Sequence, residues 1–279
     1  MKRNISPFSH WLQPDWPAIE GVHAVFTTRQ AGFSQAPWDS LNLGDHVGDN
    51  LPHVQANRAL LAQAISEHSG GPVAPVFLQQ VHGCEVLALE ASSAHGAAFD
   101  ACVTQERALA CTIMVADCLP VLIAHTSGAV VGSAHAGWRG LAGAQGQGVV
   151  EALWARYCAL LQGHGSPSDI AAQTQVWLGP CIGPQAFEVG DEVRQAFVQQ
   201  TAAAAQHFQP QAARPGKWLA NLSALARQRL AQLGVAGIYG NDGTPSWCTV
   251  SQPALFFSHR RDAALRGSTG RMAACIWKV

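Results

Sequence analysis

The chain has 279 residues, of which 48% are hydrophobic and 13% charged, and its formal net charge is -1 at pH 7. Since globular proteins average roughly 25% charged residues, this composition predicts a large core, and we expect one catalytic domain over residues 1–279. The 17 Lys and Arg form no basic run and no apolar stretch reaches the roughly 18 residues that span a bilayer, which argues against nucleic-acid and membrane partners.

The first third of the chain predicts a strand, a loop and a helix. Residues 22–28 (VHAVFTT) are β-branched and aromatic, as is typical of a strand, and Gly, Gln, Ser and Pro then mark a loop over 29–40. Apolar residues at helical spacing over 50–68, with Gly70 beyond the end, predict an amphipathic helix.

The middle of the chain predicts a sheet followed by helices. Short β-type runs fill residues 76–131, broken by Gly, Asp or Pro. A helix over 141–161 and a strand over 176–182 follow, and helical patterns return over 191–200 and 218–233.

The end of the chain carries four short β-like runs, at 238–240, 247–250, 255–258 and 272–279. Strands and helices thus alternate irregularly, whereas a Rossmann fold or a TIM barrel would place a helix after each strand. The expected fold class is therefore α+β, a mixed α/β sandwich in which mixed β-sheets carry flanking helices.

The eight cysteines indicate a reducing compartment. The start of the chain, residues 1–16, has no signal-peptide core, which predicts a cytoplasmic protein whose thiols stay reduced. No C-x-x-C pair occurs, which excludes zinc ribbons and thioredoxin-type motifs. A cysteine with a special role is then expected to be a metal ligand or a nucleophile.

Three residues at the ends of predicted strands form a candidate metal site: His82 in QQVHG, Cys118 in VADCLP and His135 in GSAHAGWRG. Imidazole, thiolate and imidazole suit zinc, and three protein ligands with one open position are typical of catalytic zinc. Other residues compete for the same role, because the chain has 12 His and 8 Cys. These alternative ligands are His46, Cys84, His95 and His125.

Several charged residues are candidates for binding or proton transfer. The HAGWRG segment leads into the predicted helix, where backbone N–H groups and Arg139 would favour an anion such as phosphate. Other candidates for contacts with a phosphate or a sugar are Arg29, Arg260 and Arg261. Asp100 and Asp117 flank apolar strands as candidate acid, base or ligand-supporting groups. A solvated arginine or an ordinary turn carboxylate is the alternative in each case.

Other enzyme signatures are missing from the chain. It contains no G-x-G-x-x-G, no Walker loop, no G-x-S-x-G and no H-E-x-x-H motif. PCIGP at 180–184 lacks the second cysteine of the zinc deaminases, and no H-x-E occurs. No H-x-H pair occurs either, which argues against the histidine clusters of a multicopper oxidase.

Taken together, the motifs resemble those of the YfiH-type laccase-domain family along nearly the whole chain. They are TTR (27–29), SLNLGDHVGD (40–49), QQVHG, DACVT (100–104), ADCLP, AHAGWRG, GPCIGP and FFSHRRD (256–262). The resemblance implies a mixed α/β sandwich similar to a bacterial toxin deamidase. It also implies a zinc-dependent purine nucleoside phosphorylase with adenosine deaminase and methylthioadenosine phosphorylase activities, which acts on purine nucleosides and phosphate.

Carried over residue by residue, the resemblance places the family's metal ligands on His82, Cys118 and His135, which would also be the catalytic residues. The resemblance also implies that substrate or phosphate is bound by residues in matching motifs, namely Arg29, Asn42, His46 and Arg139. The chain departs from the family at residues 30–34, where a glycine-rich GGVS is usual, and at His259, where Tyr is common. We expect a monomer or a small homo-oligomer.

Two other functions stay open from the residues alone. The same N/S/N ligands could hold Cu²⁺ in a copper-dependent polyphenol oxidoreductase, the family's older description. Alternatively, the chain could be a binding or quality-control protein of peptidoglycan-precursor metabolism with structural zinc. Structural zinc would require a fourth protein ligand, such as Cys84 or His125.

Overall fold

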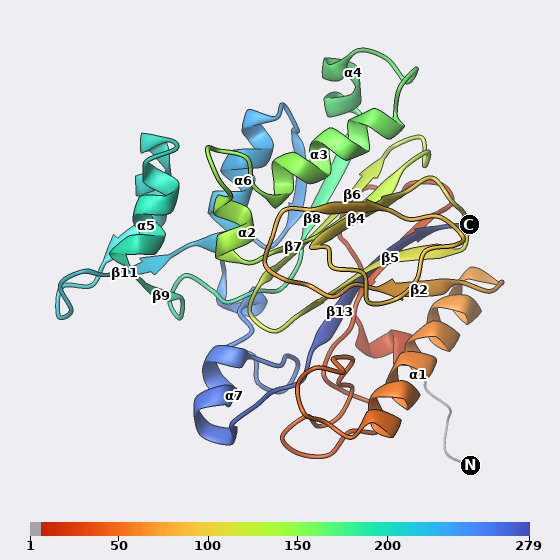
Figure 1. Cartoon of the computed structure of the whole chain (residues 1–279), viewed down its shortest axis with the longest axis horizontal. Coiled ribbons are helices and arrows are strands. Elements are labelled where there is room, and N and C mark those ends of the chain that lie inside the picture. Colours follow the sequence, from red (N-terminus) through yellow and green to blue (C-terminus); the bar gives the residue numbers. More distant parts are fainter. Residues whose placement is uncertain (1–6) are drawn as a thin grey trace.

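The computed structural model describes residues 7–279 of the chain. Within these residues the strands form sheets of four, six and three strands, and helices lie outside the two larger sheets (Figure 1). This arrangement confirms the α+β fold class. Residues 1–6, which begin the segment searched for an export signal, lie outside the described part. Nowhere in residues 7–279 is a helix both long and apolar enough to cross a membrane.

The four-stranded sheet has the order β1-β13-β5-β2. Its strands are β1 (Val22–Phe26), β2 (Ala74–Phe77), β5 (Leu109–Val115) and β13 (Met272–Lys278). β13 runs antiparallel to β1 and β5, and β2 runs parallel to β5. Since both faces of this sheet are covered, the continuous apolar run of β13 is buried rather than alternating with polar residues.

Helix α1 (Leu51–Ser69) covers the outer face of the four-stranded sheet, where Leu61 and Ile65 pack in one cluster with Trp277 of β13. The helix ends at Gly70, which has a φ of 70°. Glycine adopts this left-handed backbone without the steric cost that a Cβ brings. The helix predicted over 50–68 is therefore confirmed.

The six-stranded sheet has the order β12-β8-β6-β7-β4-β3. Its strands are β3 (Val86–Ala88), β4 (Ala101–Thr104), β6 (Leu119–His125), β7 (Val131–Ala136), β8 (Thr174–Leu178) and β12 (Gly237–Gly240). Side chains such as Leu122, Trp177 and Ile276 fill the core between this sheet and the four-stranded one. The sheet predicted over 76–131 thus divides between two layers.

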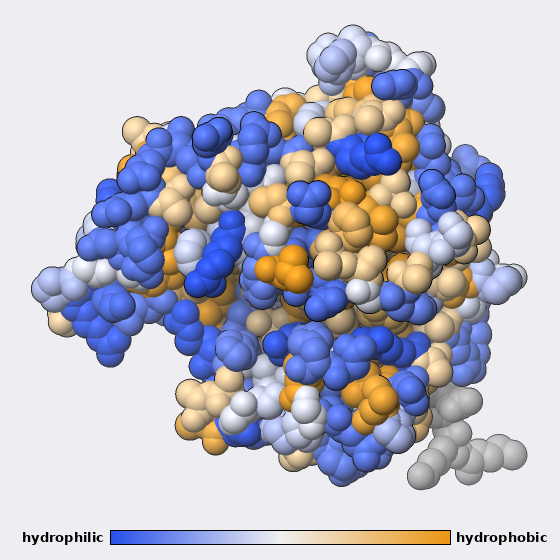
Figure 2. All heavy atoms as spheres, viewed as in Figure 1, coloured by the Kyte–Doolittle hydropathy of each residue, from blue (hydrophilic) through white to orange (hydrophobic). Residues whose placement is uncertain are grey.

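Helices cover the other face of the six-stranded sheet. They are α2 (Trp138–Ala142), α3 (Val149–Leu160) and α6 (Leu222–Gln232), and their apolar residues form one cluster with those of the sheet. The layers therefore follow the order helix, sheet, sheet, helices. On the face shown in Figure 2, hydrophilic residues cover most of the surface and hydrophobic ones gather near its centre.

The three-stranded sheet consists of β9 (Glu188–Gly190), β10 (Phe208–Pro210) and β11 (Lys217–Ala220), in the order β10-β11-β9. Helix α5 (Asp191–Val198) lies beside it, as Figure 1 shows. The remaining elements are α4 (Pro167–Ala172), α7 (His259–Arg266) and the 3-10 helices η1 (Pro7–His10), η2 (Ala202–His207) and η3 (Pro245–Trp247).

The single helix predicted over 141–161 is wrong, because α2 and α3 are separated by a turn. Gly143 and Gly146 have φ values of 61° and 79° there. A Cβ on Gly143 would overlap the carbonyl of Gln147. Gly143 therefore ends α2, and Gly146 belongs to the turn that precedes α3.

Four further predictions need correction. Residues 217–220 form β11, and Asn221 then caps α6 by accepting a hydrogen bond from the Ala224 N–H at 3.0 Å, so the helix predicted over 218–233 begins later. Residues 247–250 form only an isolated bridge, between Cys248 and Cys181, and residues 255–258 form no strand, since the Phe256 N–H bonds to the nearby carbonyl of Gln252 at 2.9 Å. The strand predicted at 176–182 ends at Leu178.

Candidate metal centre

The structure brings His82, Cys118 and His135 together. One potential ligand atom from each residue lies within 4.8 Å of those of the other two. The Sγ of Cys118 is 3.8 Å from Nε2 of His82. The two imidazole rings are edge-to-face, with centroids 4.7 Å apart and an interplanar angle of 74°. This cluster of two nitrogens and one sulfur is suited to a tetrahedral metal ion.

Different elements supply the three side chains. His135 lies in β7, opposite Pro120 of the neighbouring strand β6. Cys118 is in the turn that connects β5 to β6, directly before that strand begins. His82 lies in the segment between β2 and β3, with a left-handed φ of 61°. Strand pairing therefore places Cys118 beside His135, and an unusual backbone conformation turns His82 toward both.

Gly137 makes the close approach of these side chains feasible. A Cβ at this position would lie 2.9 Å from Cδ2 of His82 and 3.1 Å from Sγ of Cys118. Both distances are shorter than ordinary carbon contacts. The glycine of the HAGWRG motif therefore leaves the space in which the histidine and the cysteine meet.

The buried carboxylate of Asp100 supports two of the three residues. It accepts backbone hydrogen bonds from Val81, His82 and Gly83 at 3.1, 2.9 and 2.7 Å, and it lies 2.8 Å from Nδ1 of His135. Burial raises the pKa of Asp100, but the hydrogen bonds from His135 and Gly83 more than offset this and lower it. With Nδ1 held by the carboxylate, Nε2 of His135 is the nitrogen left for a metal, as in carboxylate–histidine–metal triads.

Cys118 and His135 shift each other's protonation. Burial alone raises the pKa of the Cys118 thiol, but the charge and hydrogen bond of His135, with a smaller effect of His82, lower it to about 6. Burial alone lowers the pKa of His135, whereas the Cys118 charge and the hydrogen bond to Asp100 raise it to about 9. Without metal the pair is thus a thiolate and an imidazolium at neutral pH. The thiolate is the form that binds a metal.

The three residues line a cavity of about 470 Å³. Its wall combines apolar side chains with histidines and arginines. The other lining residues are His46, Gln80, Met114, Val115, Ala116, Asp117, Trp138, Ile182, Phe187, Leu222, His259, Arg260 and Arg271. A largely apolar hollow with a few converging polar groups is typical of a small-molecule site.

Of the substrate-binding residues implied by the resemblance, only His46 reaches this cavity. The buried side chain of Asn42 instead bonds to backbone groups of Gly44 and Arg271. The guanidinium of Arg139 lies over the neighbouring Trp138 ring, 4.4 Å from its centroid. The guanidinium of Arg29 contacts Asp39 and borders a different cavity.

The alternative metal ligands lie outside the cluster. Sγ of Cys84 is 3.4 Å from the carbonyl of Gly140, and Nδ1 of His125 is 2.7 Å from the hydroxyl of Ser127. Nδ1 of His95 accepts the backbone N–H of Phe77 at 3.2 Å. In residues 7–279 the cluster contains no fourth His, Cys, Asp or Glu.

Sequence patterns did not indicate several residues of the cavity wall, above all Gln80 and Arg271. Gln80 is fixed by a reciprocal pair of 2.7 Å hydrogen bonds to the backbone of Met114. Gln80 belongs to the QQVHG motif, two residues before His82. This proximity in sequence could have indicated that it lies in the site. Arg271 precedes β13 and lies in none of the motifs. Its position depends on contacts with Asn42 and Gly44, more than 200 positions earlier.

Comparison with known proteins identifies the family of the chain. Residues 23–279 match the model of the family described as "Multi-copper polyphenol oxidoreductase laccase". The chain belongs to this family. It is 45% identical to a Pseudomonas aeruginosa protein named purine nucleoside phosphorylase PA4543 over 267 residues, 96% of this chain and 98% of that protein. It is 43% identical to Escherichia coli purine nucleoside phosphorylase YfiH, covering 97% of this chain and 100% of that protein.

The fold of the laccase-domain family is also found among solved structures. The Neisseria meningitidis protein NMB0706 superimposes with a TM-score of 0.82 at 40% identity, covering 96% of this chain and 99% of the other. YlmD from Geobacillus stearothermophilus gives a TM-score of 0.77 at 32% identity, covering 100% and 98%. The resemblance stated from the motifs is therefore confirmed.

Proposed function

We propose that the chain is a zinc-dependent purine nucleoside phosphorylase, which converts adenosine or inosine and phosphate into the free base and ribose 1-phosphate. The observation that carries this proposal is the His82, Cys118 and His135 cluster facing a cavity with both apolar and cationic walls. The names of the relatives support the same reaction. The choice of zinc rests on the ligands, since one thiolate and two imidazoles suit it.

In this reaction the bond between ribose C1′ and the purine nitrogen breaks, and a bond between C1′ and a phosphate oxygen forms. The electron pair of the broken bond leaves with the base, which then takes up a proton. A zinc ion at the cluster would supply a Lewis acid. The chain's own residues would bind the reactants: Phe187 and Leu222 offer apolar surface to the purine, and the arginines of the wall offer positive charge to the phosphate.

The same cavity supports a wider proposal, which adds adenosine deaminase and methylthioadenosine phosphorylase activities. Deamination requires water instead of phosphate as the nucleophile, and it acts on C6 of the purine. Methylthioadenosine differs from adenosine by an apolar substituent, for which side chains such as Met114 and Ile182 provide apolar surface. We propose that all of these reactions take place at the same centre, and that the bound substrate decides which reaction occurs.

The experiment is to incubate the zinc-loaded protein with adenosine, with and without phosphate, and to separate adenine, inosine and hypoxanthine by chromatography. We expect phosphate-dependent release of adenine that is lost in Cys118→Ala. Cys158→Ala is the matched control, since this half-buried cysteine lies outside the cluster. If the wild type releases no base at any phosphate concentration, the phosphorylase proposal is wrong.

The copper-dependent oxidation of phenols is a second candidate, favoured by the description of the matched family. Multicopper chemistry needs several copper sites, whereas the described residues contain only one such group of His, Cys, Asp or Glu. A copper-loaded sample assayed with a phenolic substrate tests this alternative. The rate of phenol oxidation with copper is compared with the rate of nucleoside cleavage with zinc. A higher rate of phenol oxidation would favour the oxidoreductase.

A further inference from the structure

Arg271 is a cation in the cavity wall that lacks an acidic partner. Its Nη1 donates to the carbonyls of Thr269 and Gly270, at 3.2 Å each. Among residues 7–279, no carboxylate lies within ion-pair distance of this guanidinium. Other partly buried arginines do have such partners, namely Arg29, Arg58, Arg229 and Arg261. Arg271 therefore keeps hydrogen-bonding capacity for a ligand.

The SLNLGDHVGD segment holds Arg271 in this position. Oδ1 of Asn42 accepts the backbone N–H of Arg271 at 2.8 Å and that of Gly44 at 2.9 Å. A Cβ on Gly44 would lie 2.7 Å from Cγ of Arg271, so the glycine leaves room for the arginine stem. His46 from the same segment lines the cavity as well. The segment thus shapes one wall of the site.

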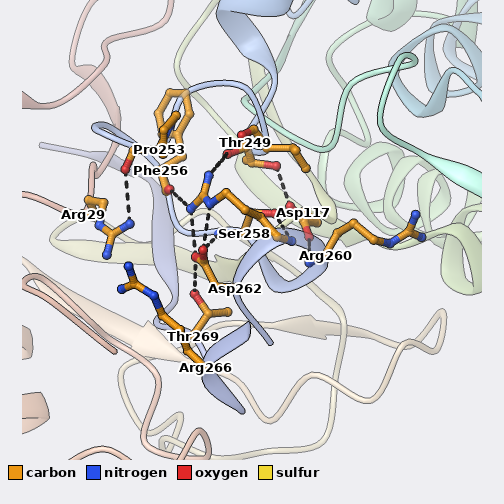
Figure 3. A network of polar contacts seen from close by, with 12 residues as sticks. Arg29, Asp117, Thr249, Pro253, Phe256, Ser258, Arg260, Asp262, Arg266 and Thr269 are labelled. Carbon is orange, nitrogen blue, oxygen red and sulfur yellow. Dashed lines mark hydrogen bonds and ion pairs between the residues drawn. The ribbon is translucent and has the colours of Figure 1, made fainter. Parts of the chain in front are cut away.

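The charge balance around Arg271 depends on how its negatively charged neighbours are engaged. Burial lowers the pKa of Arg271, and the negative charges of Cys118 and Asp117 act in the opposite direction. Asp117 is the acidic residue of the cavity wall, but its oxygens are engaged at 2.6 Å by the Thr249 hydroxyl and the Arg260 N–H (Figure 3). A divalent metal held by one thiolate would keep a net charge of about +1 beside the guanidinium. Two positive charges facing one cavity suit a dianion.

We infer that Arg271 forms an anion subsite beside the metal centre, which binds a phosphate dianion by charge-assisted hydrogen bonds. The inference rests on the proposed phosphorylase function, since it assigns the place of the second substrate. Arg260 is the other arginine of the wall, but carbonyls engage both of its terminal nitrogens, Nη1 at Ala186 and Nη2 at Glu188, whereas only Nη1 of Arg271 bonds to carbonyls. Free phosphate and a nucleotide phosphate ester present the same chemistry to Arg271.

The first test measures binding of inorganic phosphate to the zinc-loaded protein by isothermal titration calorimetry. We expect Arg271→Met to weaken phosphate binding roughly 10- to 100-fold, the range of a hydrogen bond between charged groups. Arg266→Met is the matched control, because it removes the same charge from a half-exposed side chain outside the cavity. Circular dichroism verifies that both variants are folded. An unchanged phosphate Kd in a folded Arg271→Met variant overturns the inference.

A second variant displaces the guanidinium without removing its charge. Gly44→Ala brings a methyl group against the Arg271 stem, so we expect a roughly tenfold loss of phosphate affinity with zinc content unchanged. Adenosine 5′-monophosphate, titrated in parallel, distinguishes the two phosphate sources. Equal losses for both ligands mean that the subsite accepts esters, and a loss for phosphate alone means that it takes the free anion. A Gly44→Ala variant that binds phosphate like the wild type argues against the subsite.

Turnover separates this inference from the proposed function. If adenosine is cleaved by phosphate and Arg271→Met leaves the KM for phosphate unchanged, the function stands and the subsite is wrong. If no cleavage occurs but phosphate binding still depends on Arg271, the subsite stands and the phosphorylase proposal is wrong.

Discussion

Asp100 and His135 are joined by a 2.8 Å contact between a carboxylate oxygen and Nδ1, although they are 35 residues apart in the chain. The same carboxylate accepts the backbone N–H of His82. One buried charge therefore orients the imidazole of one candidate ligand and the backbone of another. The three-residue cluster thus contacts a fourth residue, which is not among those that line the cavity.

Asp100→Asn should weaken zinc binding about 10- to 100-fold, the usual effect of altering a residue that orients a metal ligand. The amide keeps the size of the carboxylate but removes the charge that holds Nδ1–H of His135. Competition with a chromophoric chelator measures the zinc Kd. The exposed Asp15 provides the control, as Asp15→Asn. Equal zinc affinities in the two variants would show that Asp100 does not support the site.

Gly137→Ala should disturb the site by crowding alone. Its methyl group would press on His82 and Cys118, and such overpacking costs about 1–3 kcal/mol, which we expect as lost zinc-binding free energy. Gly71→Ala is the matched control, since nothing lies within 4 Å of its added Cβ. The same chelator competition decides the question, and a Gly137→Ala protein with wild-type zinc affinity would contradict the proposed geometry.

Alkylation of the metal-free protein should reveal the acidic thiol of Cys118. A pKa of about 6 means that the thiolate fraction rises with pH and is half-maximal near pH 6, so iodoacetamide should react at Cys118 already at neutral pH. The other half-buried thiols, Cys84 and Cys158, have raised pKa values and should react only in more alkaline solution.

Peptide mass spectrometry after timed alkylation reports each cysteine separately. Zinc added before iodoacetamide should protect Cys118 and leave Cys158 unchanged. A rate at Cys118 that rises only above about pH 8, as for an ordinary thiol, would be inconsistent with the pairing to His135.

The network in Figure 3 should matter for stability rather than for metal binding. The buried carboxylate of Asp262 accepts Nε and Nη2 of Arg261 at 2.7 and 2.8 Å, and Arg261 also donates to the carbonyls of Thr249 and Phe256. We expect Asp262→Asn to lower the free energy of unfolding by about 3 kcal/mol, because it leaves a largely buried arginine without its counter-ion.

Urea denaturation of the zinc-loaded protein measures this loss. The control is Arg214→Met, which breaks an exposed ion pair with Glu188 and should cost less than about 1 kcal/mol. If the two variants lose equal stability, the Arg261 and Asp262 pair does not have the assigned role.

Local patterns predicted those parts of the molecule that depend on neighbours in sequence. The periodicity of 50–68 predicted α1, and the apolar run at the C-terminus predicted β13. The patterns failed at short segments that become strands only through pairing, as at β11, whose partners are β9 and β10. A strand of four residues carries too little periodicity to be distinguished from a helix start.

By itself, the sequence determined the residue types of the candidate metal site, because His82, Cys118 and His135 lie in motifs at or near strand ends. Only the tertiary structure decided which charged residues join them. Arg29 lies in a motif, yet it bonds to Asp39 and to the carbonyl of Pro253, 224 residues away. Arg271 lies in none, yet Asn42 and Gly44 hold it in the cavity wall. The physical reason is that the partner of a long charged side chain depends on which distant segments the packed sheets bring within its reach.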